Sequence, residues 1–126
     1  MELDFQKMGG MLPAIVQDHE SGNVLMLGFM NEEAFRLTVE TGFATFYSRS
    51  RRKLWMKGEQ SGHRLSVKQI AIDCDRDCVL LRVLQSGPGV CHNGYRSCFY
   101  RRLEDGNWVV TETQEFDPAA VYGGRK

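Results

Sequence analysis

The sequence predicts a β-rich α+β fold, built from short-stranded antiparallel hairpins with one clear helix at about residues 32–41. Six or seven short runs favour strands, because they are rich in β-branched and aromatic residues and are bounded by Gly, Asn, Asp and Ser. Only one segment carries the start, stop and apolar signals of a helix. There is no internal repeat, low-complexity segment or linker, so we expect a single domain over residues 1–126.

The expected strands lie on both sides of this helix. Turn residues join the first two of them at Glu20–Asn23 and the last two at Glu104–Asn107. The run 79–84 is apolar and short enough to be one buried strand. The complete set of expected strands covers residues 14–18, 24–29, 44–48, 65–72, 79–84, 99–102 and 108–113.

The helix is predicted from its two ends and its apolar side. Asn31 suits the N-cap, and the two residues after it, Glu32 and Glu33, are acidic, as the helix dipole favours in a first turn. Gly42 suits the C-terminal cap. The expected apolar side consists of Ala34, Phe35, Leu37 and Val39.

Composition narrows the class of protein. Acidic and basic residues balance at 16 each, which implies no general attraction to nucleic acid or to anionic membranes. No apolar run approaches the roughly 20 residues that span a bilayer. The N-terminus lacks the basic start and apolar stretch of a signal peptide. We therefore expect a cytoplasmic location, where the four cysteines are thiols or metal ligands rather than disulfides.

Three carboxylates alternate at Asp73, Asp75 and Asp77. On an extended segment they point to one side, and such close like charges repel unless a cation or protons neutralise them. Their hard oxygen atoms suit Mg²⁺ or Ca²⁺. An EF-hand is excluded, because Cys78 stands where its loop needs Gly and Leu84 where it needs Glu. The alternative is a solvated acidic turn.

The cysteines fall in the same short segment, at Cys74, Cys78, Cys91 and Cys98. The spacing of Cys74, Cys91 and Cys98 is not that of a zinc finger, and buried structural thiols are the alternative. Their positions in loops rich in Gly and Ser favour a metal site, and three thiolates would leave the fourth position of zinc open, as in catalytic sites. A redox-sensing thiol protein is a third hypothesis, but no C-x-x-C pair supports it.

The basic run at 49–53 and Lys57 are interleaved with serines, so they could hold phosphates through charge-assisted hydrogen bonds. The simpler interpretation is a solvated loop. His19 and His63 have no apparent partners in the sequence, and we expect no metal role for either.

Ten short motifs in order carry a resemblance to a known family. They are LPAIVQD (12–18), VLML (24–27), MNEEA (30–34), ATFYSRSR (44–51), LW (54–55), KGE (57–59), SG (61–62), DCD (73–75), CH (91–92) and SCF (97–99). Over nearly its whole length the chain resembles the phosphoribosyl-AMP cyclohydrolases of histidine biosynthesis. The resemblance implies a hydrolase that opens the adenine ring of phosphoribosyl-AMP at the N1–C6 bond, a cyclic amidine C–N bond, and works as an intertwined homodimer.

The resemblance also implies a site. Zinc falls to Cys74, Cys91 and Cys98, shared across the dimer, and Mg²⁺ falls to Asp73, Asp75 and Asp77, whereas Cys78 matches no ligand position and is expected to be a core thiol. Zinc would activate a water molecule, and His92 is the candidate general base. The competing interpretation makes His92 a fourth zinc ligand. The residues expected to bind the substrate and its phosphates are Arg49, Arg51, Lys57, Ser61 and Arg96.

The chain departs from the family pattern at three places. The loop 87–90 is one residue longer, His63 stands in place of Asn, and Asn93 stands in place of Thr. No pyrophosphohydrolase domain follows, so we expect another protein to catalyse the preceding step. The rival hypothesis is a non-catalytic zinc- and nucleotide-binding module, which would need neither an open zinc position nor a base.

Overall fold

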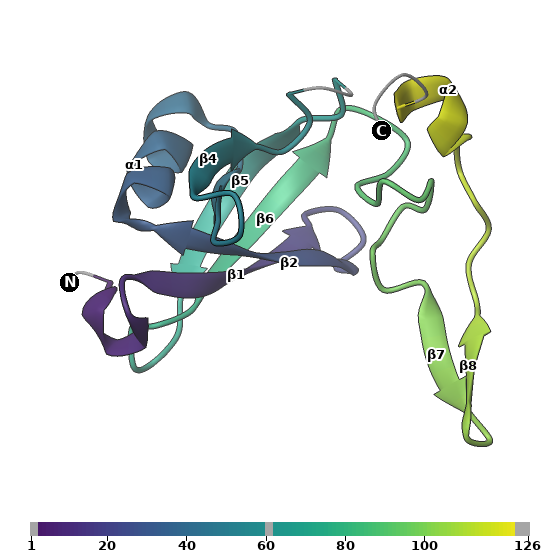
Figure 1. Cartoon of the computed structure of the whole chain (residues 1–126), viewed down its shortest axis with the longest axis horizontal. Helices are drawn as coiled ribbons and strands as arrows, with labels where there is room; N and C mark the ends of the chain where they lie inside the picture. The colour runs from purple at the N-terminus through teal and green to yellow at the C-terminus, as the bar shows by residue number, and fades with distance from the viewer. Residues whose placement is uncertain (1–2, 60–61, 123–126) are drawn as a thin grey trace.

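A four-stranded sheet forms the body of the molecule in the computed structural model, which describes residues 3–59 and 62–122 (Figure 1). Its strands are β1 (Met11–Asp18), β2 (Val24–Asn31), β5 (Leu65–Ile72) and β6 (Val79–Gln85), in the order β2-β1-β6-β5. A short 3₁₀ helix, η1 (Gln6–Met8), precedes β1. The β1–β2 and β5–β6 pairs are antiparallel, as expected of hairpin-built sheets.

The centre of the sheet differs from the prediction, because β1 and β6 pair in parallel. The paired residues run from Ala14 opposite Val79 to Asp18 opposite Val83. A parallel pair needs a long crossover, and here the chain passes through four strands and the helix α1 before it returns. The β-rich α+β class is confirmed, with a mixed sheet in place of hairpins alone.

The helix α1 (Glu32–Thr41) has the predicted bounds and caps. The Asn31 side chain accepts a hydrogen bond from the Ala34 backbone N–H at 2.8 Å, and Gly42 ends the helix with φ +78°. Its buried residues are Ala34 and Thr38, one turn apart. The placement of Val39 on the apolar side was wrong, since Val39 is 57% exposed. The Thr38 hydroxyl instead donates to the Ala34 carbonyl, which satisfies it inside the core.

A second hairpin and α1 cover one face of the sheet. It consists of β3 (Thr45–Ser48) and β4 (Lys53–Met56), and the sequence had indicated a strand only for the first of these. Phe46 of β3 is fully buried, and an added Cβ at Gly28 of β2 would lie 2.6 Å from its ring. Glycine at position 28 therefore lets β3 pack closely on the sheet. The core between these layers contains Leu12, Ala14, Val16, Met30, Ala34, Phe46, Leu65, Val79, Leu81 and Val83.

The other face of the sheet carries an apolar row that crosses all four strands. Ile15 lies opposite both Leu27 and Leu80, and Leu80 lies opposite Ala71. Leu27 is 46% exposed, and the other three are half-buried. This row is thus accessible to solvent in the single chain.

The C-terminal part leaves the body as a hairpin of β7 (Arg101–Glu104) and β8 (Asn107–Val110), followed by α2 (Pro118–Tyr122) (Figure 1). The hairpin was predicted, although β7 begins later than expected, whereas η1 and α2 were not predicted. All eight strand residues are exposed, and Leu103 pairs with Trp108 at 60% and 71% exposure. In the part of the chain described, no helix has the length and apolarity needed to cross a membrane.

Candidate metal centre

The three carboxylates meet on the loop between β5 and β6. One oxygen from each of Asp73, Asp75 and Asp77 lies within 4.8 Å of the others. The loop folds around Asp73, whose Oδ1 accepts hydrogen bonds from the Asp77 and Cys78 backbone N–H groups at 3.0 and 3.2 Å. The alternating spacing therefore gathers the side chains through a turn, rather than along an extended strand as the sequence had suggested.

The pKa values of Asp73 and Asp77 are shifted in opposite directions. Desolvation acts to raise the pKa of Asp73, but the hydrogen bonds it accepts from Asp77, Asp75 and Cys78 outweigh it and lower that pKa. Desolvation and the neighbouring Asp75 raise the pKa of Asp77. Lys7 offsets part of the charge, with its Nζ 3.7 Å from Asp77 Oδ2 and donating to the Asp75 carbonyl at 2.7 Å. A compact set of hard oxygen donors that repel one another fits a divalent cation such as Mg²⁺.

Cys91 and Cys98 form a second cluster at the far end of β6. Cys91 is buried, and its backbone N–H donates to the Tyr95 carbonyl at 3.1 Å. Cys98 is tied to the sheet by its backbone N–H, which donates to the Leu25 carbonyl at 2.7 Å. The Ser97 hydroxyl adds a bond of 2.8 Å to the Val24 carbonyl. The loop 91–98 is thereby held against the start of β2 with its two thiols together.

Lys57 lies beside this thiol pair. Desolvation lowers the pKa of Lys57, and the charges of Cys98 and Cys91 oppose that shift. Loss of water around its thiol raises the pKa of Cys98 to about 11, the Cys91 thiol adds to the rise, and the Lys57 ammonium opposes it. Cys98 is exposed as a residue, so desolvation acts on its thiol rather than on the whole side chain. Soft thiol donors next to a cation that stabilises thiolates fit zinc.

Cys74 lies at the opposite end of the sheet. It precedes Val79, the first residue of β6, which is in register with Ala14. Cys98 is held at Leu25, near the end of β1, and the paired stretch of β1 and β6 is about 13 Å long. Two thiolates on one zinc ion lie no more than about 4.6 Å apart. Among the described residues, the acidic trio is the only group of three or more with metal-binding geometry, so one chain does not gather the three cysteines.

Cys78 is half-buried instead of being a core thiol. It follows the acidic trio directly, and its Sγ is 4.0 Å from the Val79 carbonyl oxygen. Desolvation raises the pKa of Cys78, and the charges of the three carboxylates raise it further. The Cys78 thiol is therefore a poor candidate for a thiolate ligand.

The expected phosphate-binding residues divide between the two ends of the sheet. Arg49 lies 5.0 Å from the centre of the Phe29 ring, and Arg51 is in the same turn, toward the end that holds the acidic loop. Lys57 and Arg96 lie at the end that holds the thiols, where Arg96 contacts Asp18 Oδ2 at 3.5 Å. Ser61 falls outside the described residues. Both ends of the sheet therefore carry cationic side chains.

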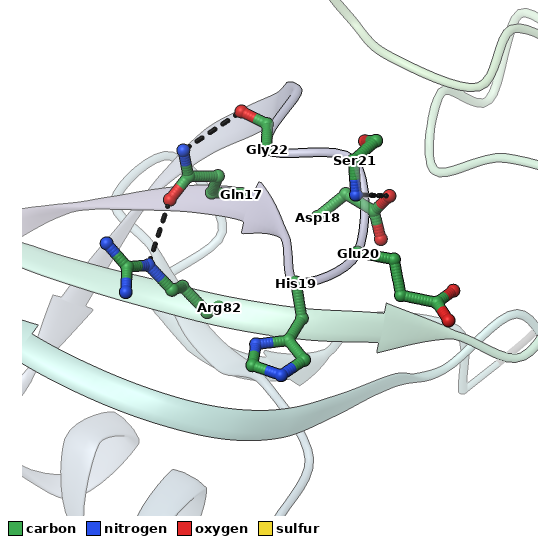
Figure 2. A pocket seen from close by; sticks show the side chains of 7 residues that line it. All are labelled: Gln17, Asp18, His19, Glu20, Ser21, Gly22 and Arg82. Atoms are coloured by element: carbon green, nitrogen blue, oxygen red, sulfur yellow. Dashed lines mark hydrogen bonds between the residues drawn. The ribbon is translucent and has the colours of Figure 1, made fainter.

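A pocket of about 320 Å³ lies at the β1–β2 turn and reaches Arg82 on β6 (Figure 2). Three of its polar side chains are engaged: Gln17 bridges the Gly22 carbonyl and Arg82, and Asp18 accepts from the Ser21 N–H (Figure 2). Desolvation acts to raise the pKa of Asp18, but hydrogen bonds from Ser21 and the charge of Arg96 outweigh it and lower that pKa. The hydrogen bonds around this pocket stabilise the β1–β2 turn, and neither a thiol nor a residue of the acidic trio lines it.

His92 directly follows the buried Cys91, and its side chain is exposed. One polar residue at the thiol end of the sheet, Gln85 at the last position of β6, was not singled out from the sequence. It is in phase with Val79, Leu81 and Val83, all fully buried. A glutamine that continues a buried apolar period is a signal that could have marked it.

The fold and the two clusters define a small strand-rich protein with hard oxygen donors at one end of its sheet and soft thiols at the other. The family model described as phosphoribosyl-AMP cyclohydrolase matches residues 26–100, which include both clusters.

Similar proteins extend this match to nearly the whole chain. A phosphoribosyl-AMP cyclohydrolase from Solibacter usitatus is 63% identical over 125 residues, covering 99% of each chain. Proteins with the same name from Desulforapulum autotrophicum and Geotalea uraniireducens are 58% and 54% identical, each over 97% of this chain and 98% of their own. This chain belongs to the phosphoribosyl-AMP cyclohydrolase family and is an enzyme, as the motifs had indicated.

Proposed function

We propose that this enzyme hydrolyses the N1–C6 bond of the adenine ring of phosphoribosyl-AMP, as a cytoplasmic step of histidine biosynthesis. One observation carries the proposal: the part of the chain that matches the family, residues 26–100, contains both the acidic trio and the thiol pair. The chemistry of these residues suits a metal-dependent hydrolysis.

Zinc is proposed to be held by Cys91 and Cys98 of one subunit and by Cys74 of a second subunit. The support is that the Cys91 thiol lies close enough to Cys98 to raise its pKa, while Cys74 lies at the opposite end of the sheet. An antiparallel arrangement of two copies packed side by side would place the acidic end of each against the thiol end of the other. Such a two-fold dimer contains two equivalent sites.

Two apolar surfaces support the proposed homodimer. The row Leu27–Ile15–Leu80–Ala71 is accessible on one face of the sheet. The β7–β8 hairpin exposes Leu103 and Trp108 and begins three residues after Cys98. Isolated two-stranded hairpins are marginally stable in water, so this one is expected to pack on a partner. Both surfaces favour a second copy of the chain over a monomer.

Mg²⁺ is proposed to be held by Asp73, Asp75 and Asp77. Their oxygens lie close enough to bind one ion, and a cation there would relieve the repulsion that raises the pKa of Asp77. The Lys7 ammonium lies 3.7 Å from Asp77 Oδ2, so its position can change when a bound cation neutralises the carboxylates.

The residues of the chain have clear tasks in the reaction. Bound zinc would lower the pKa of water to about 7 and so supply hydroxide at neutral pH. The oxygen of water adds to C6, and the N1–C6 bond then breaks. C6 keeps its exocyclic nitrogen as a carboxamide, while N1 leaves with a proton. We assign the transfer of these protons to His92, which adjoins Cys91 and is open to solvent.

The cationic residues suit a substrate with two 5′-phosphates. Arg49 and Arg51 lie at the acidic end of the sheet, and Lys57 and Arg96 lie at the thiol end. In a site made from the two unlike ends of two subunits, one phosphate could be bound by each pair. A site shared between two subunits would therefore bring both cationic pairs to the same substrate.

A non-catalytic zinc- and nucleotide-binding module is the competing function. A direct assay separates the two: phosphoribosyl-AMP is added to the purified protein with Zn²⁺ and Mg²⁺, and the ultraviolet spectrum is followed as the ring opens. The proposed function predicts a spectral change that stops when a chelator is added. Stoichiometric binding of the substrate without any spectral change would favour the module.

A further inference from the structure

The side-chain amide of Gln85 is buried without a hydrogen-bond partner. Both its Nε2 and its Oε1 are removed from solvent, and neither finds a partner in the described part of the chain. Burying an unpaired amide is unfavourable, and most buried polar side chains are paired. The half-buried Gln17 and the exposed Gln69 of the same sheet both accept hydrogen bonds from Arg82. The unpaired amide thus points to a partner that is absent from the single chain.

Gln85 lies at the end of the sheet that carries the thiols. It is opposite Leu65, the Leu65 carbonyl accepts from the Ala44 N–H, and the Ala44 carbonyl accepts from the Lys57 N–H. Lys57 in turn interacts with the Cys91 and Cys98 thiols. Strand pairing and these two backbone hydrogen bonds therefore place Gln85 and Lys57 at the same end of the sheet.

Gln85 also lies on the face of the sheet that the loop 91–98 covers. Val83, two residues earlier on β6, is buried opposite Asp18, whose carboxylate holds Arg96. Arg96 is two residues before Cys98 in the loop that crosses this end. Because side chains alternate along a strand, Gln85 shares the face of Val83 and points to the side on which this loop lies.

We propose that Gln85 is a substrate-binding residue that recognises the base, with its Nε2 donating to N7 and its Oε1 accepting from the exocyclic nitrogen on C6. This assignment rests on the proposed function. A glutamine amide matches this edge of adenine with both of its groups at once. The amide of Gln85 has both groups unused.

This edge has a further property that suits the reaction. Hydrolysis of the N1–C6 bond changes neither N7 nor the link between C6 and its exocyclic nitrogen. Gln85 can therefore keep the same two hydrogen bonds before and after the ring opens. A residue that holds this edge fixes C6 in place while N1 departs.

The test uses Gln85→Met, a change of similar shape that removes both polar groups, and Gln69→Met as the matched control on β5. We expect Gln85→Met to lower kcat/KM for phosphoribosyl-AMP by about 5- to 150-fold, the range for a bidentate amide–adenine pair. Its melting temperature without substrate should not fall, because no hydrogen bond of the free enzyme is lost. Gln69→Met should keep kcat/KM within about twofold of the unsubstituted enzyme.

A substrate analogue with carbon in place of N7 identifies the contact. The unsubstituted enzyme should lose kcat/KM with the analogue, and Gln85→Met should lose less than about twofold, because its partner for N7 is already gone. Equal losses in the two enzymes would overturn the proposal, as would a Gln85→Met variant with normal kcat/KM. Absence of turnover in the unsubstituted enzyme would instead count against the proposed function itself.

Discussion

The thiol of Cys98 has to lose its proton if it is to bind zinc as proposed. Loss of water around its thiol and the neighbouring Cys91 raise the pKa of Cys98 to about 11, so in the metal-free chain this thiol is protonated at neutral pH. A metal has to displace that proton to bind the thiolate. Lys57 opposes the rise, and its charge therefore favours the form that a metal binds.

The ligand assignment can be tested one cysteine at a time. Cys91→Ser and Cys98→Ser should each lose bound zinc and turnover, because a serine hydroxyl is a poor ligand for zinc at neutral pH. Cys78→Ser is the matched control and should keep both, since Cys78 lies beside the carboxylates instead of the thiol pair. Metal analysis of the purified variants gives the result. Full zinc content in Cys98→Ser would remove that residue from the site.

The acidic trio makes a separate prediction. Asp75→Asn should raise the Mg²⁺ concentration needed for half-maximal activity while leaving zinc bound, because an amide is a weaker ligand than a carboxylate for a hard cation. Asp105→Asn, in the exposed turn of the C-terminal hairpin, is the control and should not change the requirement. Activity measured over a Mg²⁺ series decides it. An unchanged requirement in Asp75→Asn would make the trio structural.

His92 is predicted to transfer protons. His92→Ala should keep zinc and lower kcat by roughly 10²–10⁴-fold, the usual contribution of general acid–base catalysis. The acidic limb of the pH–rate profile should flatten as well. His19→Ala, another exposed histidine, should behave like the unsubstituted enzyme. Weaker zinc binding in His92→Ala would show that His92 is a metal ligand, and normal kcat would exclude both roles.

At the scale of elements, α1 depends on its N-cap. Asn31→Ala removes the acceptor for the Ala34 N–H and should lower the free energy of unfolding by about 1 kcal/mol. Asn31→Ser retains a capping oxygen and should lose much less. Urea denaturation of the two variants gives the difference. Equal losses would mean that packing around position 31 matters more than the cap.

The elements that were predicted well are those whose signals are local. Asn31 and Gly42 mark the two ends of α1, and the strand at 65–72 has the predicted bounds. The parallel pairing of β1 with β6 was not predicted, because strand patterns say nothing about partners more than 60 residues away. Thr38 took the buried place expected of Val39, since its hydroxyl could bond within the helix.

Site residues that are close in the sequence were also predicted better than those that only the fold brings together. Asp73, Asp75 and Asp77 lie on one loop, so their spacing was enough to predict that they gather. Lys57 was expected to bind phosphate. Its place beside Cys98 follows only from the pairing of β4 with β3 and from two backbone hydrogen bonds. These bonds join Lys57 to Ala44 and Ala44 to Leu65 of β5. Gln85 was missed because the expected strand ended at residue 84, so the alternation of buried side chains was not followed to residue 85.

At the scale of the whole molecule, the proposed function treats the two ends of the single chain as two incomplete halves of one site. The acidic loop with Cys74 is at one end of the sheet, and the Cys91–Cys98 pair with Lys57 is at the other. The β7–β8 hairpin starts just after Cys98 and extends away from the body with its apolar residues exposed (Figure 1). These features together favour two copies that complete each other.

The central claim is that zinc ligands come from two subunits, and mixing two inactive variants tests it most directly. Cys74→Ser and Cys98→Ser are each inactive if both residues are ligands. When the two are unfolded together and refolded as a mixture, half of the dimers contain one of each, and such a dimer has one intact site. The mixture should regain about a quarter of the unsubstituted activity, whereas each variant refolded alone should regain none. A mixture as inactive as its components, with mixed dimers present by mass spectrometry, would contradict the shared site.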